Sequence, residues 1–540
     1  MSVENKEGRG RVYVVGLDGA TFDIINPMVA RGLLPNLAAI MKEGVHAPLR
    51  STVPAFSPVA WTSIMTGVNP GRHGIADAFI HHPDYRMSFA NSTYRKCRPV
   101  WAILNEMGYT TGVMNVPLTY PPEHVDGFMI TGMFTPETAT DFTWPVELMG
   151  ELRHRFGKYR FEAVQSENLD KVISTTYESI DQKDRVLEHL LEKSDPDFVF
   201  MVFVETDRIQ HQFWKFIDPL RPDVDDAGRA KYGSVISDVY ARLDRSLGKI
   251  MARLTPKDSV VIVSDHGFGP LRRAFSLGNW LIDNGYTAYS GNSEQTKPSF
   301  ASSLIDVFKR KALGVGPDKD KQINRFFNGV DWACTKAFTE GAAGGIFINS
   351  KDAYPNGLVN PGDEYENLRE EIIDGLMKLQ DPATGKLVVE AVHRREDVYK
   401  PMPSTQGIPD LIVTCAEGYH TISPSEAAYY KLDIEGMFFT HRWSGRHADY
   451  GVFMMKGPSA RQGVKLERAH VNDVTPTVIH LMGSPVSGEF DGRPLYEGLT
   501  GPEIGTDAAY SLANAGVVRD FSSDEARQIE EKLKELGYLD

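Results

Sequence analysis

Residues 12–19 of the chain read VYVVGLDG, a short β-branched run that ends in Asp18-Gly19. Such a run is typical of a strand that is buried on both faces of a sheet. Similar runs alternate with long helical patterns along the chain, at Phe198–Val204, Ser259–Val263, Gly345–Ile348, Asp410–Thr414 and Gly451–Met455. This alternation predicts an α/β fold of three layers, in which a mostly parallel central sheet is flanked by helices.

The intervening segments show clear helical periodicity. Between Tyr232 and Leu254, one helix face collects Val235, Ile236, Val239, Leu243, Leu247 and Ile250. Further helices are predicted from Leu368 to Leu379 and around Val172–Leu191. Near the end of the chain, Ser522 and Glu525 form a capping box for a last helix.

The length of 540 residues allows a large core, and the 41% hydrophobic and 24% charged content is ordinary for a globular protein. We expect residues 1–500 to form one α/β domain with two insertions. Residues from about 80 to 195, rich in aromatics and prolines, are predicted to form a cap. Residues from about 287 to 328 are expected to form a lid or a simple surface excursion. Residues 501–540 are expected to be a surface extension that carries the terminal helix.

The formal net charge of −14 disfavours a nucleic-acid-binding surface. The N-terminal residues lack the apolar region of a signal peptide and the roughly 20-residue apolar span of a membrane helix, so no membrane association is expected. The three cysteines, Cys97, Cys334 and Cys415, are far apart and odd in number. They imply no disulfide framework, and a cytoplasmic location is expected.

Acidic and imidazole side chains follow the predicted strands, at the ends where open α/β sheets place their sites. Taken singly, each has an ordinary explanation, because Asp-Gly is a common turn and aspartates often cap helices. Together, three aspartates and three histidines supply mixed oxygen and nitrogen ligands, which suit zinc or manganese better than calcium or magnesium. Six ligands fit two divalent ions, which at about 4 Å apart can clamp a phosphoryl group. The set comprises Asp18, Asp207, His211, Asp265, His266 and, just before the Gly451 strand, His447.

A candidate nucleophile lies in residues 54–67, which read PAFSPVAWTSIMTG. Ser57 is predicted as the N-cap of a helix, with Pro58 at the first helical position. Its hydroxyl would lie beside free backbone N–H groups and the positive end of the helix dipole, which suits an anion. Ser57 alone could merely cap the helix, but beside metal ligands its hydroxyl would become a nucleophile of low pKa.

These residues resemble the alkaline phosphatase superfamily, and most closely its type I phosphodiesterase/nucleotide pyrophosphatase branch. The similarity runs from Val12 to about Leu495. VVGLDGATFD resembles the first strand and metal aspartate of that branch, and SPVAWTSIMTGVNPGRHGI resembles its nucleophile helix. Three later stretches resemble the remaining metal-ligand motifs of that branch: ETDRIQHQFW, VIVSDHGFG and GRHADYGVFMMKGP. The stretch NDVTPTVIHLMGSPVSGEFDGRPL resembles the closing segment shared across the superfamily.

The resemblance implies that one ion is held by Asp207, His211 and His447. It implies that the second ion is held by Asp18, Asp265 and His266, and that Ser57 bridges towards both ions as the attacking group. The branch commonly has an asparagine three residues after the nucleophile, where this chain has Ala60. The preference for diesters over monoesters is therefore open. Backbone N–H groups after Pro58, or Arg208, or Lys336, could replace that asparagine.

The resemblance implies a metal-dependent hydrolase of small phosphate esters, with phosphodiesters or pyrophosphates favoured and with a phosphoserine intermediate on Ser57. Two divalent ions are implied, zinc first and manganese as the alternative. The other readings are a phosphomonoesterase or phosphomutase on the same site, a sulfohydrolase, and a non-catalytic metal-binding protein. The leaving group and the oligomeric state are left open.

Overall fold

The computed structural model describes residues 10–536, apart from residues 165, 222, 290–329, 342–343, 423–436, 442, 502, 504, 506–509 and 515. The chain divides into two compact units. Unit 1 comprises Met1–Ile75, Asn91–Leu271 and Trp443–Arg519, and unit 2 comprises Ala76–Ala90, Arg272–Arg442 and Asp520–Asp540. Each unit therefore contains segments that lie far apart in the sequence.

Unit 1 is built on a ten-stranded sheet. Five neighbouring strands run parallel: β9, β1, β8, β5 and β6. On one side β18 is antiparallel to both β9 and β2, and on the other side β7 is antiparallel to β6. The strand order is β19 (Val464–Lys465), β2 (Val45–Arg50), β18 (Tyr450–Lys456), β9 (Ser259–Val263), β1 (Val12–Leu17), β8 (Phe198–Phe203), β5 (Thr111–Met114), β6 (Gly127–Ile130) and β7 (Thr143–Trp144), with β20 (Ala469–His470) also paired to β2.

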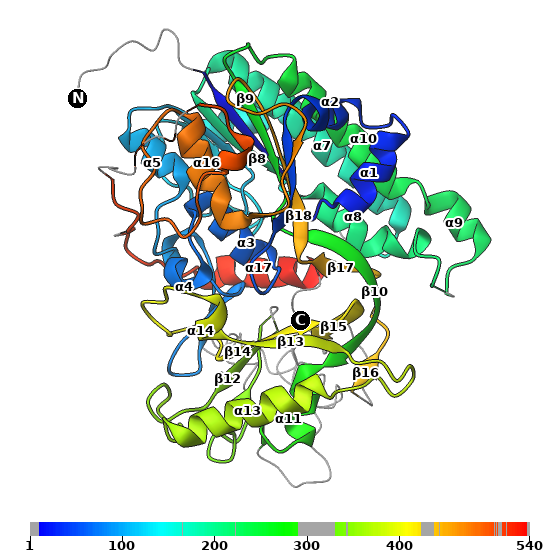
Figure 1. The fold of residues 1–540 in the computed structure, drawn as a ribbon, viewed down its shortest axis with the longest axis vertical. Coiled ribbons are helices and arrows are strands. Elements are labelled where there is room, and N and C mark those ends of the chain that lie inside the picture. The colour runs from blue at the N-terminus through cyan, green and yellow to red at the C-terminus, as the bar shows by residue number, and fades with distance from the viewer. Residues whose placement is uncertain are drawn as a thin grey trace, which may run out of the picture. The chain divides into compact units, whose positions relative to one another are not determined.

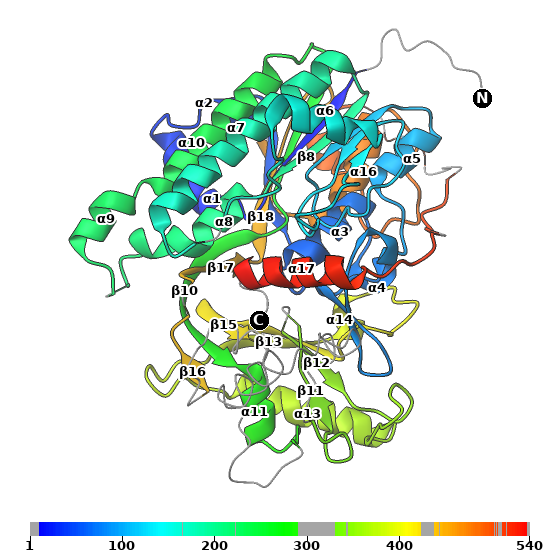
Figure 2. The same ribbon diagram turned by 180° about the vertical axis from the view of Figure 1, so that it is seen from behind.

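Helices cover both faces of this sheet, as Figures 1 and 2 show from opposite sides. Every residue of β1, β8 and β9 is buried, which explains why these strands read as continuous apolar runs. One face carries α1 (Phe22–Ala30), α2 (Pro35–Glu43), α7 (Leu169–Lys193), α8 (Glu205–Phe213) and α10 (Val235–Met251). The other carries α3 (Ser57–Thr66), α5 (Val100–Glu106) and α16 (Val474–Leu481). The prediction of a three-layer, mostly parallel α/β fold is confirmed.

The strands predicted at Val12–Leu17 and Ser259–Val263 are found at those residues, and the predicted strand at Phe198 ends one residue earlier, at Phe203. The apolar face predicted between Tyr232 and Leu254 is the buried face of α10. The strands expected at Gly345 and Asp410 exist, but they belong to a separate sheet in unit 2. Periodicity indicates that a strand is buried, and it does not indicate which sheet the strand joins.

The segment at about 80–195, expected to form a cap, is placed differently by the structure. Residues 111–144 supply β5, β6 and β7 to the main sheet, α5 packs against β5, and α7 packs against α8 and α10. These strands are two to four residues long, so they carry too little periodicity to be recognised among prolines and aromatic residues. The remaining helices of unit 1 are α4 (Pro70–His73), α6 (Glu147–Phe156) and α9 (Asp226–Tyr232).

Unit 2 contains one four-stranded sheet and the larger part of a second one. One has the order β11 (Ala337–Phe338), β12 (Gly345–Ile348), β14 (Leu411–Cys415) and β13 (Val389–Arg394), and it packs with α11 (Leu277–Asp283) and α13 (Asp363–Met377). The other joins β15 (Gly418–Ile422), β10 (Gly267–Ser276) and β16 (Phe438–Phe439), and β17 (Gly445–Ala448) pairs with the first residues of β10, which belong to unit 1. The short helix α14 (Arg395–Val398) follows β13.

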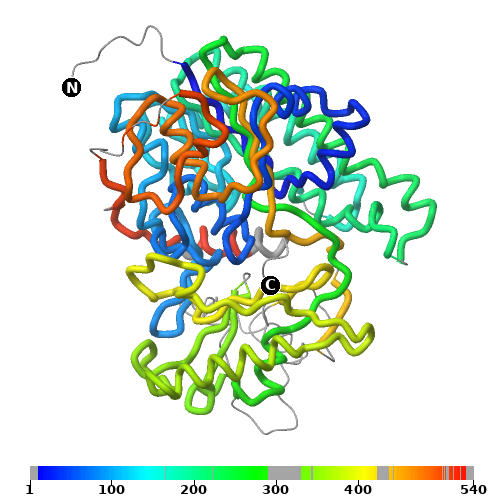
Figure 3. The backbone as a smooth tube through the Cα atoms, viewed as in Figure 1, coloured from blue at the N-terminus to red at the C-terminus, as the bar shows by residue number. Residues whose placement is uncertain are grey.

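A hairpin of β3 (Phe79–His81) and β4 (Met87–Phe89) also belongs to unit 2, where Figure 3 shows it in blue beside green and yellow segments. Its tip residue Tyr85 stacks between Trp332 and Tyr354, with ring centroids 3.8 and 5.0 Å away. Residues 290–329 lie outside the described residues, and with them nearly all of the lid expected at about 287–328.

The terminal helix α17 (Ser523–Leu536) begins with the predicted capping box. The Ser522 N–H donates to Glu525 Oε2 at 2.8 Å, and the Glu525 N–H donates to Ser522 Oγ at 3.3 Å. Among the described helices, no single one is both long and apolar enough to cross a membrane. The bent pair α1 and α2, at 98° to each other, meets the length and composition criteria together.

Candidate active site

The predicted site residues of unit 1 meet at the carboxyl edge of the parallel strands. Asp18 directly follows β1, Asp207 lies in the first turn of α8 after β8, and Asp265 follows β9. Because these three strands are parallel neighbours, their carboxyl ends lie at one edge. His447 lies in β17, just before β18, and it reaches the same edge because β18 runs antiparallel to β9.

Two histidines gather around one oxygen of Asp207. Oδ1 of Asp207 lies 3.3 Å from Nε2 of His211 and 3.2 Å from Nε2 of His447. The two Nε2 atoms are 3.1 Å apart. Asp207 and His211 are four residues apart on α8, so they share one helix face.

A second group forms around His266, whose ring stacks on that of His447 at a centroid distance of 3.7 Å. Nε2 of His266 lies 3.6 Å from Asp18 Oδ1, 3.2 Å from Asp265 Oδ2 and 4.0 Å from Asp207 Oδ1. The carboxylate of Asp207 therefore faces both groups. All six predicted ligand residues are brought together by the structure.

The hydrogen bonds of the three imidazoles determine which nitrogen faces the cluster. Nδ1 of His211 donates to the Gly445 carbonyl at 2.9 Å, and Nδ1 of His266 donates to the Gly267 carbonyl at 2.9 Å. Nδ1 of His447 donates to the carbonyl of Ala55 at 3.0 Å. A carbonyl only accepts, so each Nδ1 carries a proton, and Nε2 is the nitrogen that each ring turns towards the cluster. This is the usual arrangement of histidines that bind metals.

Each carboxylate has one oxygen held by a donor. Asp18 Oδ2 accepts from the Trp61 indole N–H at 2.8 Å, and Asp207 Oδ2 accepts from the Arg208 guanidinium at 3.2 Å. Asp265 Oδ1 accepts from the Gly19 N–H at 3.2 Å, in a tight turn where Gly19 has φ of +67°. The opposite oxygens, Asp207 Oδ1 and Asp265 Oδ2, are buried and have no hydrogen-bond donor.

Buried oxygens without donors are rare in folded proteins, and a bound cation is one of the few groups that would satisfy them. Two groups of side chains place their ligand atoms within 4.8 Å of one another: Asp207, His211 and His447, and Asp18, Asp207 and His266. Three imidazole nitrogens and three carboxylates suit a divalent transition-metal ion. The residues present therefore fit divalent cations.

The close packing of these groups shifts the pKa values of their side chains. Burial raises the pKa of Asp18 well above its ordinary value, and the charges of Asp265 and Asp207 add to the rise. Burial and the charge of Asp207 raise the pKa of Asp265 to about 7. Burial alone would also raise the pKa of Asp207, but the two histidines and the guanidinium beside it hold that pKa well below its ordinary value. Burial lowers the pKa of His266 to about 4. The raised pKa values of Asp18 and Asp265 show that the carboxylates repel one another here, and a bound cation would relieve that repulsion.

The hydroxyl of Ser57 lies within this arrangement. Its Oγ is 3.1 Å from Nε2 of His266 and 3.4 Å from Oδ1 of Asp18. Phe56 is the N-cap of α3, so the prediction that Ser57 caps the helix is wrong by one residue. Ser57 is the first helical residue, at the end of the helix where the dipole is positive.

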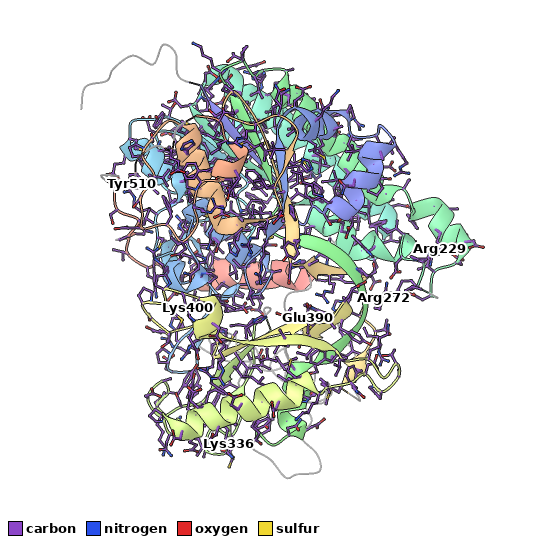
Figure 4. All side chains as sticks on the ribbon, viewed as in Figure 1. Arg229, Arg272, Lys336, Glu390, Lys400 and Tyr510 are labelled. Carbon is purple, nitrogen blue, oxygen red and sulfur yellow. The ribbon has the colours of Figure 1, made fainter. Side chains whose placement is uncertain are left out.

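The structure places the three groups that could replace the missing asparagine in different surroundings. The N–H groups of Val59 and Ala60 both donate to the Phe56 carbonyl, within the first turn. Arg208 is buried and already bonded to Glu162 and Asp207. Lys336 is an exposed residue of unit 2, labelled in Figure 4.

Trp61 also takes part in the site, and the sequence does not indicate this role although Trp61 lies within residues 54–67. Trp61 is four residues after Ser57, so the helical spacing places it on the same face. Its bond to Asp18 depends on a spatial relationship that the spacing does not reveal.

Comparison with known proteins identifies the family. Residues 12–442 match the profile of the type I phosphodiesterase / nucleotide pyrophosphatase family. The chain belongs to this family. It is accordingly a phosphohydrolase, from a metal-dependent family that acts on small nucleotide and phosphate ester substrates. His447 lies beyond the matched residues, so its place in the site rests on the geometry.

Solved structures show the same fold. Human ectonucleotide pyrophosphatase / phosphodiesterase 5 superposes with a TM-score of 0.50 over 91% of this chain and 100% of that chain, at 15% sequence identity. The murine protein of the same name gives a TM-score of 0.50 with the same coverage, at 13% identity. At these identities the similarity concerns the fold. A search of curated proteins found no match.

Proposed function

We propose that the chain hydrolyses small phosphate esters with two divalent metal ions and a phosphoserine intermediate on Ser57. One observation carries this proposal: the Ser57 hydroxyl lies beside Asp18 and His266 of one group of ligand atoms, and Asp207 is common to both groups. Buried carboxylate oxygens without hydrogen-bond donors lie among these ligand atoms. A purely structural cluster would satisfy such oxygens with donors from the protein.

Asp207, His211 and His447 would hold one ion. Asp18, Asp265 and His266 would hold the other, with Ser57 adjoining both. Zinc is the proposed metal because three imidazole nitrogens complete the donor set, and manganese is the alternative. Two such ions would supply positive charge that lowers the pKa of the Ser57 hydroxyl and stabilises the charge developing on the phosphoryl and leaving oxygens.

The side chains and backbone of the protein carry out the remaining steps of the reaction. The Ser57 hydroxyl loses its proton, and its oxygen attacks phosphorus in line with the leaving oxygen. The bond between phosphorus and that oxygen breaks, and the product alcohol or phosphate departs with a proton. Water then attacks the phosphoserine and releases the second product, which restores the hydroxyl. Backbone carbonyls hold the three histidines in the tautomer that presents Nε2 throughout.

Phosphodiesters and pyrophosphates are the substrates that family membership favours. A phosphomonoesterase is the second candidate, because Ala60 is fully buried and has no polar side chain to contact an additional non-bridging oxygen. Turnover of bis-p-nitrophenyl phosphate and p-nitrophenyl phosphate, measured side by side, separates the two. A larger kcat/KM for the diester supports the first assignment, and a larger value for the monoester supports the second.

We further propose that the protein works in a reducing compartment such as the cytoplasm. Cys97 and Cys334 form no disulfide, and Cys334 is exposed. Labelling of Cys334 by a thiol reagent in freshly lysed cells tests this proposal, because an oxidising location would leave that thiol modified.

A further inference from the structure

We propose that Trp61 is a positioning residue of the active site, which holds the Asp18 carboxylate in a fixed orientation against the helix that carries Ser57. This inference rests on the proposed function, because it concerns how a metal ligand of that site is aimed. Trp61 acts through that carboxylate, to which its indole N–H donates.

The first observation is that α3 contacts both oxygens of one carboxylate. Asp18 Oδ1 lies 3.4 Å from Ser57 Oγ, and Asp18 Oδ2 accepts from the Trp61 indole N–H at 2.8 Å. Ser57 and Trp61 are one helical turn apart, so both contacts come from the same helix face. The carboxylate can therefore rotate only if the bond to Trp61 breaks.

The second observation is that the Trp61 ring occupies the space beside Gly16, a residue without a side chain. Gly16 precedes Asp18 by two residues in β1, and a Cβ atom at Gly16 would lie 2.4 Å from the Trp61 ring and 2.8 Å from a methyl group of Val202. No side chain can occupy that place while the indole is there. The ring also packs edge-on against Phe200, with a centroid distance of 6.2 Å.

Together these contacts give Trp61 a role that an apolar core residue would not have. The side chain is fully buried, so its N–H needs an acceptor, and Asp18 supplies one at the edge of the sheet. Without that donor, Asp18 Oδ2 would be a buried oxygen with no partner, and the carboxylate would be free to turn Oδ1 away from its ligand position. Groups that orient metal ligands in this way typically contribute a factor of about 10–100 to metal affinity.

The chain offers a matched control in Trp101. Trp101 is also fully buried and also donates its indole N–H to a carboxylate, Glu123 Oε2, at 2.9 Å. It lies on α5, and Glu123 is not among the site residues. Replacement of either tryptophan by phenylalanine removes one buried indole N–H and puts a smaller phenyl ring in place of the indole, so general effects on stability should be comparable.

The experiment is a metal titration of the metal-free full-length protein with Zn²⁺, in competition with a chromogenic chelator. We expect the wild-type protein and Trp101→Phe to bind two ions with the same affinities. In Trp61→Phe, one of the two ions should bind about 10–100-fold more weakly. Gly16→Ala should weaken the same ion, because it displaces the ring without removing the N–H.

Two results would overturn the inference while leaving the proposed function intact. One is a Trp61→Phe variant that binds both ions like the wild type. The other is a Trp101→Phe variant that loses as much affinity as Trp61→Phe, since the effect would then be a general consequence of a disturbed core. A wild-type protein that binds no ion would overturn the proposed function, and this inference with it.

Discussion

Nε2 of His266 lies 3.1 Å from the hydroxyl oxygen of Ser57, and both side chains are almost fully buried. Burial lowers the pKa of His266 to about 4, so the ring is neutral near pH 7. The backbone carbonyl of Gly267 accepts its Nδ1 proton, so Nε2 can only accept. A hydroxyl in this place is therefore surrounded by acceptors: a nitrogen lone pair and an oxygen of Asp18. That environment favours loss of the hydroxyl proton once cations neutralise the carboxylates.

Replacement of Ser57 by alanine should abolish turnover and leave the metal content intact. The ligand set does not depend on the hydroxyl, whereas the attack on phosphorus does. By comparison with other covalent nucleophiles, kcat should fall by roughly 10³–10⁶-fold. The check is steady-state kinetics on phosphate esters, together with metal analysis of the same preparation. A variant that retains turnover would show that another group attacks phosphorus.

Replacement of Asp207 by asparagine should cost one ion per chain. Asp207 Oδ1 faces both groups of ligands, and the amide would remove its negative charge while keeping the shape of the side chain. Metal content measured by mass spectrometry, before and after the change, tests this. Asp352→Asn, at an exposed carboxylate of unit 2, is the control and should keep both ions. Full metal content in Asp207→Asn would remove Asp207 from the site.

Removal of metal by a chelator should eliminate activity and lower stability. Ions that bind only the folded chain stabilise it by about 2.7 kcal/mol at a concentration of 100 times Kd. We expect a lower unfolding temperature after treatment with chelator, and recovery of both properties when Zn²⁺ or Mn²⁺ is restored. Full activity in the chelated, dialysed protein would contradict a metal-dependent reaction.

The PGRHG motif after α3 predicts a pH dependence of stability. Burial lowers the pKa of His73 to about 3, and Arg95 adds to the shift. The Ile75 N–H donates to Nδ1 of His73, and Nε2 of His73 lies 2.9 Å from Ser63 Oγ, so the folded state requires the neutral ring. In the unfolded chain the pKa is about 6.5, and the unfolded state therefore takes up a proton below that pH while the folded state does not.

Stability should accordingly fall as the pH falls from about 6.5 towards 3. Between pH 7 and pH 5, His73 should account for about 2 kcal/mol of the decrease in the free energy of unfolding. Urea denaturation of the wild type and of His73→Gln at these two pH values measures it. The variant should lose less stability on acidification than the wild type. Equal losses in the two proteins would show that His73 is not buried in its neutral form.

Two of the ligand residues could be predicted from the sequence because they stand at the ends of apolar strands. Asp18 and Asp265 follow β1 and β9, whose residues are all buried, so the ends of these strands are visible in the sequence. Parallel neighbours then share one carboxyl edge, which is a general property of such sheets. For His447, the same reasoning gives only a position just before β18. The antiparallel pairing of β18 with β9 is what brings His447 to that edge.

Other features could not be read from the sequence, for physical reasons. The strands β5, β6 and β7 are too short to show periodicity, so the segment that contains them was expected to be a cap. The strands at Gly345 and Asp410 look like those of the main sheet, because burial produces the same pattern in either sheet. The bond from Trp61 to Asp18 depends on the absence of a side chain at Gly16, which is a matter of packing in three dimensions.

The most direct measurement of the central claim is anomalous diffraction at the zinc edge from crystals of the full chain grown with Zn²⁺. We predict two peaks about 4 Å apart, one beside Asp207, His211 and His447 and the other beside Asp18, Asp265 and His266, with Ser57 Oγ next to both. The absence of any peak among these side chains, in crystals of protein that hydrolyses phosphate esters, would contradict the account.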